Sequence, residues 1–168
     1  MYTSISNKGK VLDMNILEFL TPKTETSFLE SDSTIRQALE KYDYHKFSVV
    51  PVIDKYGHFV CTISEGDILR FIKNNCHFDI KLAEETRIDS LEKYRPYQAL
   101  DINCSIEDVI RLSFDQNFIP MVDDRGMYIG IVKRKAIIQY FYDNKEEVER
   151  KIKREDVKAN GKNCVSCV

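Results

Sequence analysis

The sequence contains an internal repeat, and a repeat restricts the fold of a chain more than any other feature. A segment near residue 50 aligns with one near residue 120 after a shift of 69 positions, from 51 to 120. Neither copy is long enough to bury a good core alone, so the two copies are expected to pack face to face. The aligned pairs include Pro51 with Pro120, Asp54 with Asp123, Gly57 with Gly126, Val50 with Ile119, Ile53 with Val122 and Ile68 with Ile137.

Each copy predicts the same order of elements, which is strand, helix, strand, strand and helix, and hence an α+β fold. The second helix of each copy is expected to start near Ser64 or near Lys133. The helical spacing i, i+3, i+4, i+7 is followed in the first helix by Ile35, Ala38, Leu39 and Tyr42. Strands are expected at Thr26–Glu30, Phe47–Ile53 and His58–Ile63, and again at Gln98–Ile102, Phe118–Val122 and Met127–Val132.

The repeat also sets the expected domain organisation of the chain. Short helices are expected at Met14–Leu20, before the first strand, and at Ile88–Tyr94, between the copies. The expected ranges are a flexible extension at 1–13, a first repeat at 14–76, a linker at 77–96, a second repeat at 97–144 and a charged helical tail with cysteines at 145–168.

Composition narrows the class of protein. Hydrophobic residues make up 43% and charged residues 31% of the chain, which is typical of a globular domain and too apolar for disorder. The net charge of -2 gives no field that would favour nucleic acid, and no apolar run is long enough to span a bilayer. With no secretory signal and an odd number of cysteines, five, the chain is expected to be cytoplasmic.

Two sequence patterns carry a resemblance to a known family. They are PVID-x-x-G-x-x-x-x-x-IS-x-x-DIL in the first copy and IPMVDD-x-G-x-x-x-GIV in the second. Together with MNILEFLTPKTE, ALEKYDYHKFSVVPVID and DQNFIPMVDDRG, they resemble a pair of CBS domains, known as a Bateman module, over residues 14–142. The likeness is greatest to the stand-alone CBS pairs of clostridia and related bacteria.

This resemblance implies two units related by a pseudo-twofold axis, with clefts between them. It further implies a non-catalytic regulatory sensor that binds an adenine ligand such as AMP, ADP, ATP, cyclic di-AMP or S-adenosylmethionine, and that signals to a protein partner in trans. Apolar residues on the outward helices predict a homodimer. The alternative is a structural dimerisation module whose clefts are vestigial.

The sequence SEGD at the start of a helix has two interpretations. Ser64 and Asp67 form the pattern of a capping box, which stabilises a helix and needs no ligand. The same geometry could bind a nucleotide, since free amides and a hydroxyl attract phosphate and a carboxylate accepts ribose hydroxyls. The resemblance favours binding and implies base contacts from the second repeat, at Ala99, Phe118, Ile119 and Pro120. Cys61 stands where the family usually has glycine.

The second copy lacks this pattern, because Lys133 replaces the serine and Ala136 replaces the aspartate. Cations at a helix N-terminus oppose the helix dipole, so helix stability alone does not favour them. Either an anion binds there, helped by residues across the cleft, or the basic side chains extend into water. The residues of this possible anion site are His45, Lys46, Lys133 and Lys135.

No catalytic or metal-binding pattern is found in the sequence. There is no glycine-rich phosphate loop and no Ser-His-Asp or Cys-His constellation. A single C-x-x-C at Cys164 and Cys167 is weak evidence for zinc, and a tail with two thiols is the simpler interpretation. No enzyme activity, metal or cofactor is therefore expected.

Overall fold

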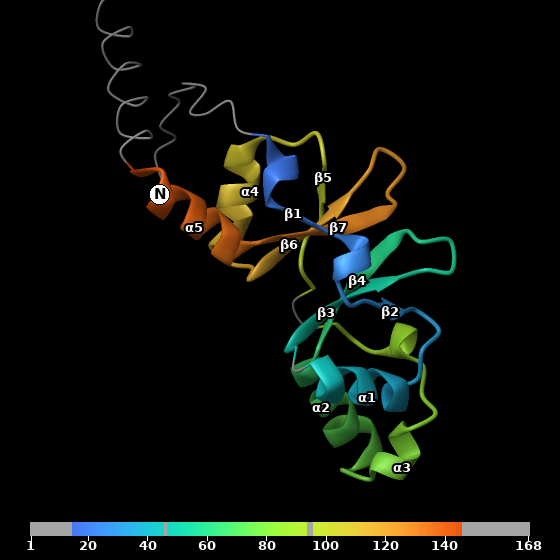
Figure 1. Cartoon of the computed structure of the whole chain (residues 1–168). Helices are drawn as coiled ribbons and strands as arrows, with labels where there is room; N and C mark the ends of the chain where they lie inside the picture. Colours follow the sequence, from blue (N-terminus) through green and yellow to red (C-terminus); the bar gives the residue numbers. More distant parts are fainter. Residues whose placement is uncertain (1–14, 46, 94–95, 146–168) are drawn as a thin grey trace, which may run out of the picture.

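The computed structural model describes residues 15–45, 47–93 and 96–145, and it confirms the α+β fold with two units of the same element order (Figure 1). The first unit consists of β2 (Leu29–Glu30), α1 (Ile35–His45), β3 (Val49–Ile53), β4 (Phe59–Ser64) and α2 (Glu65–Cys76). The second unit consists of β5 (Leu100–Asp101), α4 (Ile106–Ser113), β6 (Phe118–Val122), β7 (Tyr128–Lys133) and α5 (Arg134–Asp143).

Each unit is built on a small mixed sheet. In the first, β2 is parallel to β3, and β3 is antiparallel to β4. In the second, β5 is parallel to β6, and β6 is antiparallel to β7. The opening strands, β2 and β5, are shorter than the sequence predicted, because only two residues of each pair with the next strand.

The apolar runs of the sequence account for the core of each unit. Four of the five residues of β3 are buried, as expected for a central strand with both faces covered. The helices α1 and α2 place Ile35, Ala38 and Ile68 against this strand, all nearly inaccessible to solvent. Tyr42 is also buried, and its hydroxyl donates to the carbonyl of Ile63, so the single polar atom of this ring is satisfied.

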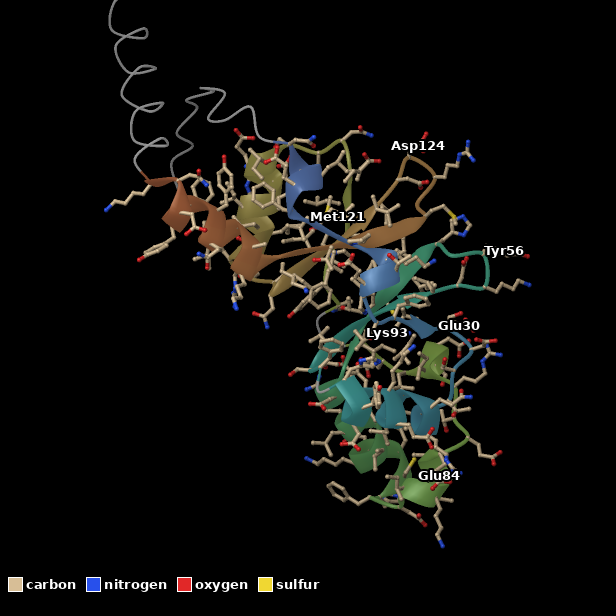
Figure 2. The ribbon with its side chains drawn as sticks, viewed as in Figure 1. Glu30, Tyr56, Glu84, Lys93, Met121 and Asp124 are labelled. Atoms are coloured by element: carbon tan, nitrogen blue, oxygen red, sulfur yellow. The ribbon has the colours of Figure 1, made fainter. Side chains whose placement is uncertain are left out.

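The two units meet through their β-hairpins by a reciprocal pair of backbone hydrogen bonds. The amide of Phe59 donates to the carbonyl of Gly126 at 3.0 Å, and the amide of Tyr128 donates to the carbonyl of Gly57 at 2.9 Å. Phe59 and Tyr128 are counterparts in the repeat, as are Gly57 and Gly126, so each bond is the counterpart of the other. This is the relation expected of a pseudo-twofold axis. Figure 2 shows Tyr56 and Asp124 near the tips of the two hairpins, which project to the same side.

The N-terminal segment packs on the second unit, although the expected range of the first repeat, 14–76, includes it. A 3-10 helix, η1 (Ile16–Phe19), puts both of its end residues into the core of the second unit. The next strand, β1 (Leu20–Pro22), pairs antiparallel with β7 and completes a four-stranded sheet of order β1-β7-β6-β5. A second 3-10 turn, η2 (Lys23–Glu25), then leads back to the first unit.

The expected linker, 77–96, likewise contributes to a core. Ala83, Ile88 and Leu91 are buried in the core of the first unit. The structure has a short helix, α3 (Ile80–Ala83), that the sequence did not predict, and a 3-10 turn, η3 (Ile88–Ser90), where a helix to Tyr94 was expected. The extension at 1–13, Lys46, Tyr94 and the tail from 146 lie outside the described residues.

None of the helices in the described part of the chain has the length and apolar character needed to cross a membrane.

Candidate functional site

The N-terminus of α2 carries the motif that the sequence singled out, and it forms a complete capping box. The hydroxyl of Ser64 accepts from the amide of Asp67 at 3.1 Å. The Oδ2 atom of Asp67 accepts from both the amide and the hydroxyl of Ser64, at 2.8 and 2.7 Å. The capping interpretation of this motif is therefore confirmed, and it leaves a nucleotide-binding role open.

The other carboxylate oxygen of Asp67 is engaged by an arginine one turn further along the helix. The guanidinium of Arg70 donates to Oδ1 at 2.7 Å, and the side chain of Asp67 is only 6% exposed whereas that of Arg70 is 48% exposed. Both residues line a cavity of about 220 Å³, called here the Asp67 cavity. Its other walls come from the first unit and the segment after it, namely Phe71, Asn74, Asn75 and Glu92.

A second cavity, of about 260 Å³, is lined by residues of both units and is called here the Lys133 cavity. Both sheets contribute to its walls, which are mostly apolar. The first unit and the segment before it supply Glu25, Thr26, Ser27, Phe47, Val49 and Pro51. The second unit supplies Asn117, Phe118, Ile131, Lys133 and Lys135.

The charge at this cavity differs from that at Asp67. The first turn of α5 holds no acidic residue, and Lys133, at the N-cap, makes no side-chain hydrogen bond to the helix. Arg134, next to it, donates to Asn117 and to the carbonyl of Ser113. The exposed side chains of Lys133 and Lys135, together with the N-terminus of α5, which has no side-chain cap, make this end of the cavity attractive to an anion.

A third cavity, of about 270 Å³, lies near the pseudo-twofold axis and is called here the Tyr97 cavity. The amide of Tyr97 donates to the hydroxyl of Thr62 at 2.7 Å, and the ring of Tyr97 packs on that of Phe118 with centroids 4.9 Å apart. This cavity shares Phe47, Val49, Asn117 and Phe118 with the Lys133 cavity.

None of the expected base-binding residues lines the Asp67 cavity. Phe118 lines the Lys133 and Tyr97 cavities but not the Asp67 cavity. Ile119 and Pro120 are buried, and Ile119 belongs to the core of the second unit. Ala99 is half-buried and lines none of these three cavities.

The possible anion site is placed only in part. Lys133 and Lys135 line one cavity together. His45 is exposed and stacks on Phe47, with ring centroids 5.5 Å apart, so it lies next to a wall of the same cavity. Lys46 is outside the described residues.

Sequence reasoning missed several residues that the structure brings to these cavities. Val49 and Pro51 line the Lys133 cavity, and they are the repeat counterparts of Phe118 and Pro120. Applying the shift of 69 positions in the reverse direction would have found them. Arg70 had no such signal, because its counterpart in the second unit is the neutral Gln139.

Among the described residues, no group of three or more His, Cys, Asp or Glu side chains is arranged to hold a metal ion.

Solved structures similar to this chain are CBS-domain proteins. A CBS domain protein from Streptococcus pneumoniae TIGR4 is 25% identical, with a TM-score of 0.66 over 73% of this chain and 83% of that one. CbpB from Listeria monocytogenes, in complex with c-di-AMP, is 18% identical, with a TM-score of 0.68 over 79% and 98%. CBSX2, in complex with AMP, is 22% identical, with a TM-score of 0.62 over 78% and 98%.

No curated protein matches the sequence. The family model of the CBS domain matches residues 22–74 and again residues 94–143, which together form more than half of the chain. These two ranges contain the strands and helices of the two structural units except the last two residues of α2, and they leave out η1, most of β1, α3 and η3. The sequence match and the paired α+β units agree, and the chain belongs to the CBS domain family.

Proposed function

We propose that this protein is a non-catalytic regulatory module that binds an adenine nucleotide in the cleft between its two CBS units and passes the signal to a protein partner. The observation that carries this proposal is the Lys133 cavity. Its walls come from both sheets, so a ligand bound there contacts both units and can change the angle between them. Its apolar walls suit a base, and Lys133 and Lys135 suit a phosphate.

The solved relatives support the same ligand class. CbpB of Listeria monocytogenes is in complex with c-di-AMP and CBSX2 with AMP, so the fold accommodates adenine ligands in related proteins. The second candidate site is the cleft at Ser64 and Asp67, called here the Asp67 cleft. There Ser64 and Asp67 would hold a ribose, with base contacts from the second unit at Phe118 and its neighbours.

Titration calorimetry with AMP, ADP, ATP and cyclic di-AMP tests the proposal, with GMP as the control for the base. A ligand at 100 times its dissociation constant stabilises the folded protein by about 2.7 kcal/mol, which a thermal shift detects independently. Val49→Trp fills the Lys133 cavity and is expected to abolish binding there. Val60→Trp, on the next strand at a side chain that is 50% exposed and outside these cavities, is the matched control.

If none of the adenine ligands binds in these titrations, the structural alternative remains, which is a dimerisation module with vestigial clefts. One observation favours dimerisation in either case. Leu69 on α2 and Ile138 on α5 are repeat counterparts, and they are 60% and 61% exposed. Two large apolar side chains in equivalent positions on the outer helices suit a self-complementary interface.

We therefore also propose a homodimer through these helices. Light scattering of the purified protein at micromolar concentration is expected to give twice the mass of the 19.7 kDa chain. The double change Leu69→Glu and Ile138→Glu is expected to give the monomer mass, while Leu82→Glu, on α3 at a side chain that is 65% exposed, is expected to keep the dimer. A monomer mass for the unaltered protein would contradict the proposal.

A further inference from the structure

The guanidinium of Arg70 lies over the first turn of α2, where a bound ribose would have to approach Asp67. Both of its terminal nitrogens lie 3.6 Å from the point that a Cβ atom on Gly66 would occupy, so the side chain folds back over this residue at ordinary contact distance. One of these nitrogens donates to Oδ1 of Asp67 at 2.7 Å. The arginine is thus held at the carboxylate by position and by charge.

We propose that Arg70 makes the Asp67 cleft selective for phosphorylated adenosine ligands over adenosine itself. The inference rests on the proposed function, because it takes Asp67 as the acceptor of ribose hydroxyls. Arg70 is then a specificity-determining residue, whose guanidinium leaves the carboxylate when a ligand binds and pairs with the phosphate of that ligand.

The hydrogen bonds of Asp67 explain why a ribose competes with the arginine. Oδ2 already accepts two hydrogen bonds from Ser64, and these bonds cap the helix. A ribose is therefore expected to donate to Oδ1, which is the oxygen that Arg70 engages. An unphosphorylated nucleoside that shares this oxygen weakens the ion pair and brings no anion in exchange.

The surrounding charges explain why a phosphate compensates for the loss of the ion pair between Asp67 and Arg70. The first turn of α2 carries Glu65 and Asp67, and Glu92 lines the Asp67 cavity. These carboxylates repel a phosphate, and among the described residues that line this cavity Arg70 is the cationic one. A nucleotide brings its own anion, so the guanidinium exchanges one charge-assisted hydrogen bond for another.

The second unit lacks this arrangement. The counterpart of Asp67 is Ala136 and that of Arg70 is Gln139, whose amide donates to Asp143 at 2.9 Å. Selection by an arginine released from a carboxylate is therefore a property of the first unit alone. The cations of the second unit, Lys133 and Lys135, need no release because their side chains are exposed.

The test compares the affinities of AMP and adenosine by titration calorimetry in the full chain. In Arg70→Met, adenosine is expected to bind about threefold more tightly, because no guanidinium competes for Asp67. AMP is expected to bind about tenfold more weakly, because its phosphate loses a charged partner. The preference for AMP over adenosine is therefore expected to fall about thirtyfold.

Two further variants make the result specific. Arg70→Lys keeps the charge and is expected to keep part of the preference. Arg36→Met removes another exposed, ion-paired helix arginine, whose side chain is 65% exposed beside Glu40, and is expected to leave both affinities unchanged. A preference that stays the same in Arg70→Met would overturn this inference and leave the proposed function intact. Binding of neither ligand to the unaltered protein would overturn both.

Discussion

The two units have the same element order, but their outer sheet edges are built differently. In the second unit, Gly130 has a φ of +153°, and a Cβ atom there would lie 2.2 Å from the carbonyl oxygen of Thr21. The glycine therefore allows β1 to pair with β7. In the first unit the equivalent position is Cys61, and among the described residues no strand pairs with the outer edge of β4.

Upstream of the first helix of each copy the repeat aligns after a shift of 71 positions, which brings Leu29 onto Leu100. On this shift the segment Leu91–Lys93 corresponds to β1. Leu91 is buried in the core of the first unit, so this segment packs on the unit without joining its sheet. Burial raises the pKa of the half-buried Cys61 thiol, and the charge of Lys93 acts on that pKa in the opposite direction. The unit with glycine at this position thus has a paired strand, and the unit with cysteine has a packed coil.

The two units also differ at the N-termini of their second helices, α2 and α5. In the first unit a carboxylate caps α2 and is itself paired with Arg70. In the second unit α5 begins with basic residues and has no side-chain cap. A duplicated fold thus keeps its core and diverges at the edges and helix ends that line its cavities.

The largest effect is expected for Gly130→Ala. The new methyl group would meet backbone atoms of β1, so the N-terminal strand must leave the sheet or the sheet must distort. The free energy of unfolding is expected to fall by about 3 kcal/mol, measured by chemical denaturation. Cys61→Ala, at the equivalent position, is the control and is expected to cost about 1 kcal/mol or less. Equal stability of both variants would show that the two edges are alike.

The next largest effect is expected for Asp67→Ala. Loss of the cap is expected to cost about 1 kcal/mol of stability, and loss of the ribose acceptor to weaken nucleotide binding at the Asp67 cleft about ten- to a hundredfold. Asp108→Ala is a matched control, because Asp108 caps α4 with Ser105 through bonds of 2.7 and 3.2 Å. It is expected to lose similar stability with unchanged affinity. If both variants bind the nucleotide with equal affinity, Asp67 caps the helix and does not bind the ribose.

A smaller effect is expected for Lys133→Ala. If an anion binds at the start of α5, sulfate or triphosphate affinity is expected to fall about threefold in the variant and to weaken steeply as salt rises. Titration at low and high salt measures both effects. Lys81→Ala, on the exposed α3, removes the same charge elsewhere and is expected to change neither. No salt dependence at all would favour side chains that simply extend into water.

The smallest effect is expected for Tyr128→Phe, which makes the second unit match Phe59 of the first. The hydroxyl of Tyr128 is 3.1 Å from that of Thr26, and its loss is expected to cost about 0.5 kcal/mol. Burial raises the pKa of Tyr128 from 10.0 to about 12. Its contribution to stability is therefore present below pH 10 and lost as the pH rises towards 12. The free energy of unfolding, measured by chemical denaturation at each pH, should fall less steeply with rising pH in the variant.

The repeat and the periodicity of the sequence were enough to predict the main elements. The order of elements, the hairpins β3–β4 and β6–β7 and the start of α2 at Ser64 depend on local patterns, and the structure has them. The pairing of β1 with β7 could not be predicted in this way. This pairing is three residues long and places Leu20 opposite Val132, far away in the sequence, so no local sequence pattern indicates it.

The candidate site was predicted less completely than the fold. The pattern of Ser64 and Asp67 was visible because a capping box has a fixed spacing. The role of Arg70 depends on which way a long side chain folds over Gly66, and only the three-dimensional arrangement determines that. The base-binding residues assigned to Asp67 included Ile119, which is completely buried in the core, because a strand pattern does not say which of its apolar residues face a cavity.

The pairing of β1 with β7 has a consequence for the order in which the chain folds. During synthesis the N-terminal segment is made early, yet its partner strand ends at Lys133 and follows more than a hundred residues later. Contacts between such distant positions form slowly, because the intervening loop must close first. The first unit can therefore collapse while Ile16 and Phe19 are still exposed, and these side chains find their places only when the second unit arrives.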